Sequence, residues 1–443
     1  MITKLAFGTD GIRAHENDFP FEEKTLFALG RAIGIWAQKK YTTSTPEILI
    51  TSDTRASCPK ITAWLATGLM HEQVIVHDGG ILPTPGNLLL IKHTPKFNAG
   101  IVISASHNPY HDNGIKFFDA CSGKISDEDQ ATIIHLFSTF YDHTAALPPV
   151  QTPTRWAQAQ QTYVDFIVQR YPTNTLAGTT IALDCAHGAT YEVAPAIFKT
   201  LGATLHVINN HPTGYNINQN CGSLFPQTIQ KTVETTASTL GFAFDGDGDR
   251  LVAVGNDGSL KNGDDVLYLL SQLPQYAHVP ALVGTIMSNK GLEFALQQGN
   301  KKLIQTAVGD RHVVQAMHTH HLPLGGESSG HTIINDYLPT SDGIVVALEL
   351  ARYALMTQNI NLESFVHFPS ALINLKVQHK IPLSTPALAS LIKAYERKIH
   401  PGALLIRYSG TEPILRIMTQ AQTQERATEI AQSITQELQA LFS

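Results

Sequence analysis

The sequence predicts an α/β protein in which short β-strands alternate with amphipathic helices. Three observations support this fold class. Apolar runs of strand length end in polar loops, segments with apolar residues at helical spacing lie between them, and the pattern restarts several times along the chain. Such strands form parallel or mixed sheets, whose functional loops follow the carboxyl ends of the strands. Functional residues are therefore expected in the polar motifs that follow apolar runs.

The elements expected from this pattern come in four groups. The first group has strands in 47–53, 73–80 and 99–106 and a helix in 59–69. The second has strands in 179–188 and 203–209 around a helix in 192–202, and the third begins with a strand in 280–289. The last has a strand in 371–378, a helix in 386–399, two strands around 407–413 and a helix from Glu425. This last group predicts a small α+β unit.

The chain of 443 residues is too long for one core, because domains average roughly 150 residues. A Pro/Thr-rich stretch at Leu147–Thr154 indicates a linker. Further divisions are expected after the DGDGDR motif and near His367. The expected domains are 1–150, 151–256, 257–369 and 370–443.

The composition excludes several classes of protein. With 31 Lys and Arg against 37 Asp and Glu, the chain lacks the basic surplus of a nucleic-acid binder. Its four cysteines are scattered and form no CxxC pair, which argues against a disulfide framework or a zinc site and favours a reducing compartment. No apolar run reaches the roughly 18 residues of a membrane span. We therefore expect a soluble, cytoplasmic protein.

The sharpest motif is FAFDGDGDRLVAV at 242–254, in which Asp245, Asp247 and Asp249 alternate with glycines. The glycines permit a tight loop that converges the three carboxylates, and these would repel each other without a cation. An all-oxygen set favours magnesium or calcium over zinc. The other reading is an Asp/Gly turn in a hairpin. An EF-hand is disfavoured, because position twelve of the loop is Asn256 rather than Glu.

The stretch ISASHNPYHDNGIKFF raises a second candidate, Ser106, at the end of an apolar run. Turn-forming residues follow it, and Asp112–Gly114 is expected to send the chain back and return Lys116 near the serine. His107 is not expected to act as a base for Ser106, because adjacent side chains diverge. In isolation, the stretch also fits a turn whose serine hydroxyl bonds the backbone.

Three further motifs carry polar groups suited to sugar phosphates. RYSGTEPILRIM suits a phosphate dianion through Arg407, Ser409, Gly410, Thr411 and Arg416, or is a solvated hairpin turn. PLGGESSGH presents Glu327, Ser329 and His331 to sugar hydroxyls, or is a flexible loop whose histidine caps or fills a core. FGTDGIRA places Arg13 near a phosphoryl group, or is an ion-paired turn.

Two other polar stretches are interpreted as structural. HTHH at 318–321 is expected to be a solvated helix end, because no carboxylate or cysteine set surrounds it. The stretch Asp53–Arg55 is expected to be an ion pair.

The order FGTDGIR, SASHNP, DGDGDR, GGESSGH and RYSGTEP resembles the α-D-phosphohexomutase superfamily. DCAHGATYEVAP and GYNINQNCGS resemble its branch that acts on glucosamine phosphates. The resemblance implies three similar α/β domains with mixed sheets and a C-terminal α+β domain around a central cleft. It also implies interconversion of glucosamine 6-phosphate and glucosamine 1-phosphate, which supplies UDP-N-acetylglucosamine and cell-wall synthesis.

The resemblance implies a role for each candidate. Ser106 carries a phosphoryl group, and together with Asp245, Asp247 and Asp249 it holds one Mg²⁺ per chain. Lys116, Arg13 and His331 lie near the reacting oxygen. Glu327 and Ser329 bind the sugar hydroxyls. The non-reacting phosphate is bound by Arg407, Ser409, Gly410, Thr411 and Arg416. A bisphosphorylated sugar acts as activator.

The implied partner is a hexosamine phosphate, with no nucleic acid and no membrane, and the enzyme is expected to be a monomer or homodimer. Ala14, Cys58, His187 and Tyr408 depart from the family pattern without removing a catalytic group. A phosphoglucomutase or phosphomannomutase on the same scaffold remains an alternative. So do a Mg²⁺-dependent phosphatase using Ser106, and a binding module in which the aspartates hold Ca²⁺ without catalysis.

Overall fold

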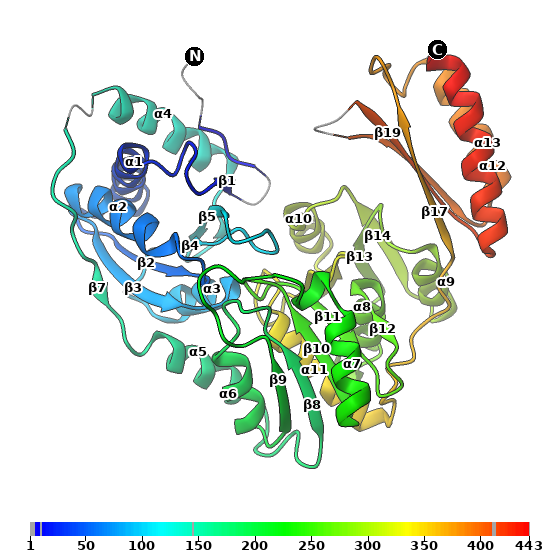
Figure 1. The fold of residues 1–443 in the computed structure, drawn as a ribbon, viewed down its shortest axis with the longest axis horizontal. Coiled ribbons are helices and arrows are strands. Elements are labelled where there is room, and N and C mark those ends of the chain that lie inside the picture. The colour runs from blue at the N-terminus through cyan, green and yellow to red at the C-terminus, as the bar shows by residue number, and fades with distance from the viewer. Residues whose placement is uncertain (1–4, 9–10, 144–145, 410–412, 443) are drawn as a thin grey trace.

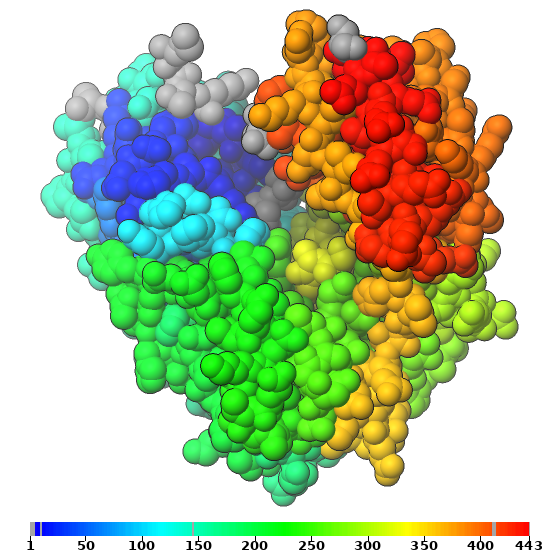
Figure 2. Space-filling view, turned by 45° about the vertical axis from the view of Figure 1, so that its right-hand side comes forward, coloured from blue at the N-terminus to red at the C-terminus, as the bar shows by residue number. Residues whose placement is uncertain are grey.

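In a computed structural model, residues 5–8, 11–143, 146–409 and 413–442 are described, and they form four units with sheets of seven, five, four and three strands. The units follow one another along the chain (Figure 1). The first domain (blue) and the last (orange and red) stand on either side of an open groove in the space-filling view (Figure 2). The expected fold class, α/β with mixed sheets and a C-terminal α+β domain, is confirmed.

The first domain is built on a mixed sheet in the order β1-β5-β4-β2-β3-β7, with β6 beside β5. Its elements are β1 (Ile12–His15), α1 (Glu23–Tyr41), β2 (Glu47–Ser52), α2 (Cys58–His71), β3 (Ile75–Ile81), α3 (Thr84–His93), β4 (Ala99–Ile103), β5 (Asp112–Asp119), β6 (Gly123–Lys124), α4 (Asp127–His143) and β7 (Thr154–Arg155). Every residue of β4 is buried and apolar, as expected for a central strand covered on both faces. The expected strand 99–106 ends early, at Ile103, because the backbone turns before Ser106.

The second and third domains repeat the α/β pattern with sheet orders β12-β11-β10-β8-β9 and β14-β13-β15-β16. The second contains α5 (Ala159–Val168), β8 (Thr180–Asp184), α6 (Val193–Thr200), β9 (Thr204–Ile208), α7 (Gln227–Thr236), β10 (Leu240–Phe244), β11 (Leu251–Val254) and β12 (Leu260–Lys261). The third contains α8 (Gly263–Ser271), β13 (Ala281–Thr285), α9 (Lys290–Gln298), β14 (Lys302–Thr306), α10 (Asp310–His320), β15 (Leu324–Gly326), β16 (Thr332–Ile334) and α11 (Gly343–Thr357). Short 3₁₀ helices lie at Gly222–Leu224 and Pro274–Tyr276.

The C-terminal domain has an antiparallel sheet in the order β17-β19-β18, covered by two helices. Its elements are β17 (Ser370–Lys376), α12 (Pro386–Ile399), β18 (Ala403–Tyr408), β19 (Ile414–Gln420) and α13 (Gln424–Phe442).

The domain ranges expected from the sequence stay a prediction. β7 and β12 each join the sheet that precedes them in the chain. Among the described helices, none is long and apolar enough to cross a membrane.

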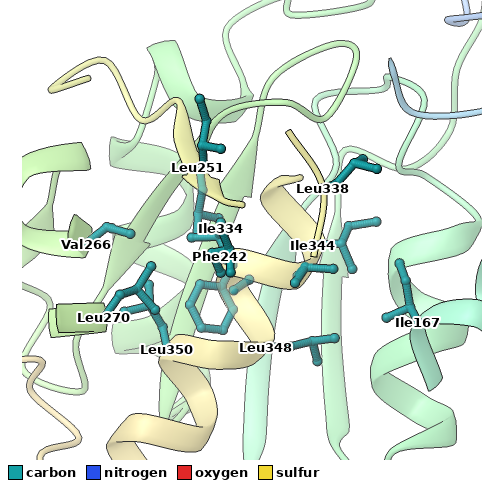
Figure 3. Close-up of a cluster of buried hydrophobic side chains, with 14 of the residues drawn as sticks. Ile167, Phe242, Leu251, Val266, Leu270, Ile334, Leu338, Ile344, Leu348 and Leu350 are labelled. Carbon is teal, nitrogen blue, oxygen red and sulfur yellow. The ribbon is translucent and has the colours of Figure 1, made fainter. Parts of the chain in front are cut away.

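One hydrophobic core runs through the second and third domains and also includes residues of the first domain, such as Leu89 of α3. Phe242 of β10 and Leu350 of α11 belong to the same buried cluster (Figure 3). Each large apolar side chain buried there contributes about 1.5–3 kcal/mol, so this core holds the two domains as one body. The C-terminal domain has a separate core, which includes Leu415 and Ile417.

The C-terminal domain is joined to the third through the linker 363–369, whose polar groups are bonded to the third domain. Ser364 Oγ donates to Asp265 Oδ1, and His367 Nε2 lies 2.7 Å from the same oxygen. The hydrogen bond that the imidazole donates to Asp265 raises the pKa of His367 above its ordinary value. The Asn289 side chain accepts from the N–H of Phe368 and donates to its carbonyl. The linker is therefore fixed to the third domain along its length, while the domain beyond it keeps a core of its own.

Candidate active site

The aspartate motif forms the loop between β10 and β11, which pair antiparallel. The hairpin alternative and the metal-site prediction are therefore compatible. One carboxylate oxygen from each of Asp245, Asp247 and Asp249 lies within 4.8 Å of the other two, and all three side chains are buried. Gly248 takes a φ of +72°, a region that favours glycine, so this residue lets the loop turn tightly.

The donor set fits a hard divalent cation. Burial raises the pKa of Asp245 well above its usual value, and the neighbouring charges of Asp249 and Asp247 raise it further. Burial also opposes ionisation of Asp249, but Lys116 and His331 outweigh it and lower the pKa of that carboxyl. Oδ1 of Asp247 and Oδ1 of Asp249 are buried and accept no hydrogen bond from the described residues. Buried carboxylate oxygens without partners are suited to bind Mg²⁺.

Ser106 lies directly at this loop. Its Oγ donates to Asp245 Oδ2 over 2.6 Å, although the two residues are 139 positions apart in the chain. Ser106 has a φ of +53°, so the chain leaves β4 in a left-handed turn that aims the hydroxyl across the domain boundary. The structure thus brings the predicted phosphoryl carrier and the predicted metal ligands together.

The expectation that His107 points away from Ser106 was wrong. His107 Nδ1 lies 3.3 Å from Ser106 Oγ, because the left-handed backbone at Ser106 brings the two adjacent side chains to the same side. Burial lowers the pKa of His107 to about 4, and the charges of Arg250 and Arg13 add to the effect. His107 is therefore neutral at pH 7 and can accept a proton from a neighbouring hydroxyl.

The strand register brings Lys116 back toward the Ser106 loop. β5 runs antiparallel to β4 and places Lys116 opposite Val102, one strand away from the serine loop. Lys116 Nζ lies 2.7 Å from Asp247 Oδ2 and 3.3 Å from Asp249 Oδ2. The ammonium group therefore stands among the carboxylates that surround Ser106, where it offsets part of their charge.

The sugar-binding candidates follow β15 in a loop at 327–331. Glu327 Oε1 accepts from the backbone N–H of Gly309, which fixes the carboxylate at the mouth of the loop. His331 lies between two carboxylates, with Nδ1 3.8 Å from Asp249 Oδ1 and Nε2 3.6 Å from Asp310 Oδ2. Burial alone would lower the pKa of His331, but these carboxylates raise it.

The phosphate-loop candidates lie on β18 and β19 of the C-terminal domain. Arg407 and Arg416 are direct cross-strand partners, so both guanidinium groups leave the same face of the sheet. The N–H of Ser409 donates to Ile414 O over 2.8 Å and continues the pairing of β18 with β19. Tyr408, one of the residues that depart from the family pattern, is held in place by two hydrogen bonds. Its Oη accepts from the N–H of Ile381 and donates to the carbonyl of the same residue. Gly410 and Thr411 lie outside the described residues.

These groups meet in one cleft of about 740 Å³. Seven of the predicted site residues line it: Arg13, Ser106, Asp249, Glu327, Ser329, His331 and Arg407. Asp245, Asp247 and Lys116 lie buried beneath its floor, in contact with Ser106 or with each other. Of the described phosphate-loop candidates, Arg407 reaches the cleft lining while Ser409 and Arg416 do not.

Comparison with known proteins gives the same picture. Family models described as phosphoglucomutase/phosphomannomutase match the chain as α/β/α domains I, II and III at residues 4–142, 161–258 and 262–370, and as the C-terminal domain at 372–437. The phosphoglucosamine mutase of Acinetobacter baumannii (strain ACICU) is 39% identical, and the alignment covers 97% of each chain. That of Syntrophotalea carbinolica is 40% identical over 98% of this chain and 97% of the relative.

The chain belongs to the phosphoglucosamine mutase family. A solved phosphoglucomutase/phosphomannomutase family protein from Burkholderia thailandensis shares its fold, with a TM-score of 0.77, 20% identity, and coverage of 98% of this chain and 97% of the other. In this mutase the three α/β domains and the C-terminal domain each contribute a residue to the cleft, namely Ser106, Asp249, Glu327 and Arg407.

Sequence reasoning did not assign several residues of this mutase that the structure places at the site. Gly309 and Asp310 line the cleft, and Asp310 is the group that faces His331. They lie at the start of α10, far from any recognised motif. Arg250 also lines the cleft. It directly follows the aspartate triplet in the chain, so its position was a signal for a site role.

Gly246 of the mutase is expected to be intolerant of any side chain. A Cβ there would lie 2.6 Å from both Ser106 O and Asn218 Nδ2, closer than a Cβ atom approaches non-bonded atoms. We expect Gly246→Ala to push the serine loop off the aspartate loop and to lower kcat by roughly 10²-fold, since displacements of about 1 Å have that effect. Steady-state kinetics test this. Gly299→Ala is the control, because a Cβ at Gly299 meets nothing closer than 3.5 Å. A Gly246→Ala enzyme with wild-type kcat would contradict the packing argument.

Proposed function

We propose that the chain interconverts glucosamine 6-phosphate and glucosamine 1-phosphate through a phosphoserine at Ser106 and a sugar bisphosphate intermediate. The observation that carries the proposal is the 2.6 Å hydrogen bond from Ser106 Oγ to Asp245, within a carboxylate cluster that fits Mg²⁺ and beside a cleft lined by cations. The names of the full-length relatives support the amino sugar as substrate.

The reaction requires two matched phosphoryl transfers. In the first, the bond between Ser106 Oγ and phosphorus breaks, a bond from phosphorus to the free sugar hydroxyl forms, and the hydroxyl proton passes to a base of the site. The bisphosphate then turns end for end. In the second, its other phosphate returns to Ser106 Oγ, and the sugar oxygen released there takes up a proton. The enzyme regains its phosphoserine, and the net change is the position of the phosphate.

The residues of the cleft have distinct roles in this scheme. Asp245, Asp247 and Asp249, with a phosphate oxygen on Ser106, would hold one Mg²⁺, which supplies positive charge next to the transferring phosphoryl group. Arg13 and Lys116 add positive charge near the reacting oxygen. Neutral His107 accepts a proton, and His331, held between carboxylates, donates one.

The remaining groups bind the substrate. Glu327 and Ser329 accept and donate hydrogen bonds to the sugar hydroxyls, and the carboxylate of Glu327 suits an ammonium group as well. The phosphate that does not react is bound by the C-terminal loop: Arg407, Ser409, Gly410, Thr411 and Arg416. Phosphorylation of Ser106 is maintained by the bisphosphorylated sugar. The scattered free cysteines support a reducing, cytoplasmic setting, and we propose a monomer or homodimer.

Parallel measurements on purified protein test the proposal. Incubation with Mg²⁺ and glucosamine 1,6-bisphosphate should place one phosphoryl group on Ser106, as shown by intact mass and phosphopeptide mapping. Initial rates with glucosamine 1-phosphate, glucose 1-phosphate and mannose 1-phosphate should give the highest kcat/KM for the amino sugar. A higher value for glucose 1-phosphate would favour a phosphoglucomutase. Release of inorganic phosphate without isomerisation would favour a phosphatase.

A further inference from the structure

We propose that Arg55 and Asn218 are positioning residues that hold the Ser106 loop in its reactive geometry. Arg55 Nη2 donates to Ser106 O over 3.0 Å and to Asn108 O over 2.9 Å. Asn218 Nδ2 donates to the same two carbonyls, over 2.9 Å and 3.1 Å. Each carbonyl of the serine loop thus accepts one bond from the first domain and one from the second.

All five N–H donors of the Arg55 guanidinium group make hydrogen bonds. It is buried, and its Nε donates to Asp53 Oδ2 over 2.9 Å. Its Nη1 donates to the carbonyls of Pro109 and Asp112, so with Nη2 it reaches four carbonyls of one loop. A planar fork with five donors can do this, whereas the compact ammonium of lysine cannot. The Asp53–Arg55 pair is therefore an ion pair, as expected, that also serves the loop of the reacting serine.

The loop needs such support because Ser106 lies in an unfavourable backbone conformation. Its φ of +53° is uncommon for a residue with a side chain. Conformations of this kind persist where the surroundings fix them. Here the carbonyl of Ser106 is held by Arg55 and Asn218, and its N–H donates to Ser104 Oγ over 2.9 Å. This conformation directs the Ser106 hydroxyl at Asp245.

Asn218 connects the serine loop to the domain that carries the metal-site aspartates. Its own φ is +58°, which asparagine tolerates better than most residues, and its N–H donates to Ala186 O over 2.9 Å. A Cβ at Gly246 would touch both Asn218 Nδ2 and Ser106 O, so these groups and the aspartate loop pack against one another. The amide therefore sets the position of Ser106 relative to Asp245, across two domains.

The inference rests on the proposed role of Ser106 and predicts a specific kinetic signature. Asn218→Ala removes both donated bonds, and Asn218→Asp keeps the shape while replacing the donor with an acceptor. We expect both variants to lower kcat about 10- to 100-fold, because the reacting oxygen loses its fixed position. KM for glucosamine 1-phosphate should stay near wild type. The Tm should fall modestly, because the left-handed φ of residue 218 disfavours alanine and two buried hydrogen bonds are lost, while both variants remain folded at the assay temperature. The rate at which glucosamine 1,6-bisphosphate phosphorylates Ser106 should fall in parallel with kcat.

Asn216→Ala is the matched control. Asn216 lies in the same loop, but its side chain bonds His211 O and the N–H of Thr213 rather than the serine loop, so this variant should keep wild-type kcat. Wild-type kcat in both Asn218 variants, an increase in KM alone, or an equal loss in Asn216→Ala would overturn the inference. Absence of Ser106 phosphorylation in active wild-type enzyme would instead overturn the proposed phosphoserine mechanism. Failure of the positioning role and failure of the proposed function are therefore distinguished by different measurements.

Discussion

Ser106→Ala is expected to abolish mutase activity, with a loss in kcat of at least about 10⁴-fold. The substitution removes the Ser106 hydroxyl, which donates to Asp245 at the lining of the cleft, so neither proposed transfer has a phosphoryl donor or acceptor at this residue. Folding should remain intact, because the backbone contacts of residue 106 do not involve the hydroxyl. Coupled assays from either sugar phosphate, together with thermal unfolding, measure both quantities.

Ser122→Ala provides the control for this result. Ser122 lies on an exposed turn of the same domain, and its hydroxyl bonds Asp119 outside the cleft. We expect its kinetics to match wild type. An active Ser106→Ala enzyme, with kcat within tenfold of wild type, is incompatible with a phosphoserine mechanism and would return Ser106 to the role of a turn hydroxyl.

Asp245→Asn is expected to separate activity from stability. Asparagine keeps an oxygen for the Ser106 hydroxyl but removes one of three buried negative charges. Without a third carboxylate, cation binding weakens, and we expect kcat to fall on the order of 10²–10³-fold. Without added metal, the variant should be more stable than wild type at pH 7, because two carboxylates repel less than three. Thermal unfolding with EDTA and with Mg²⁺ tests this.

The stability difference has a defined pH dependence. The folded-state pKa of Asp245 is raised above its usual value of 3.8, so ionising this group costs the folded protein stability. In metal-free wild type, the contribution of Asp245 is favourable below pH 4 and is lost as the pH rises through the raised pKa. The Tm advantage of Asp245→Asn should therefore grow from about pH 4 upward. Asp165→Asn, an exposed position of the same domain, should show no such trend. A Tm advantage that is independent of pH would contradict the argument.

The sequence was most informative where chemistry is concentrated in a short stretch. Asp245, Asp247 and Asp249 could be identified because tight Asp-Gly repeats leave few structural explanations, and the strand before them was clear from its apolar run. The helix expected at 386–399 is found with the same limits, because its proline start and apolar spacing are local signals. The return of Lys116 followed from turn-forming residues that act over a few positions.

The features that could not be predicted depend on contacts between distant segments. His107 lies beside Ser106 because of a left-handed backbone angle, and that angle is imposed by donors 51 and 112 residues away in the chain. From the sequence, Arg55 was expected only to form an ion pair with Asp53. Four of its five side-chain hydrogen bonds go to backbone carbonyls, and no pattern of side chains in the sequence indicates such partners. Asp310 reaches His331 through the folding of the third domain alone.

The separate core of the C-terminal domain and its fixed linker have a consequence for affinity. In the proposed mechanism the sugar bisphosphate is a bivalent ligand, with one phosphate for the Ser106 side of the cleft and one for the loop near Arg407. Because the linker 363–369 holds the C-terminal domain near the other three, capture of the second phosphate is an intramolecular event at a high effective concentration. Either phosphate can then dissociate from its half-site while the other stays bound, so the intermediate can change ends without leaving the enzyme.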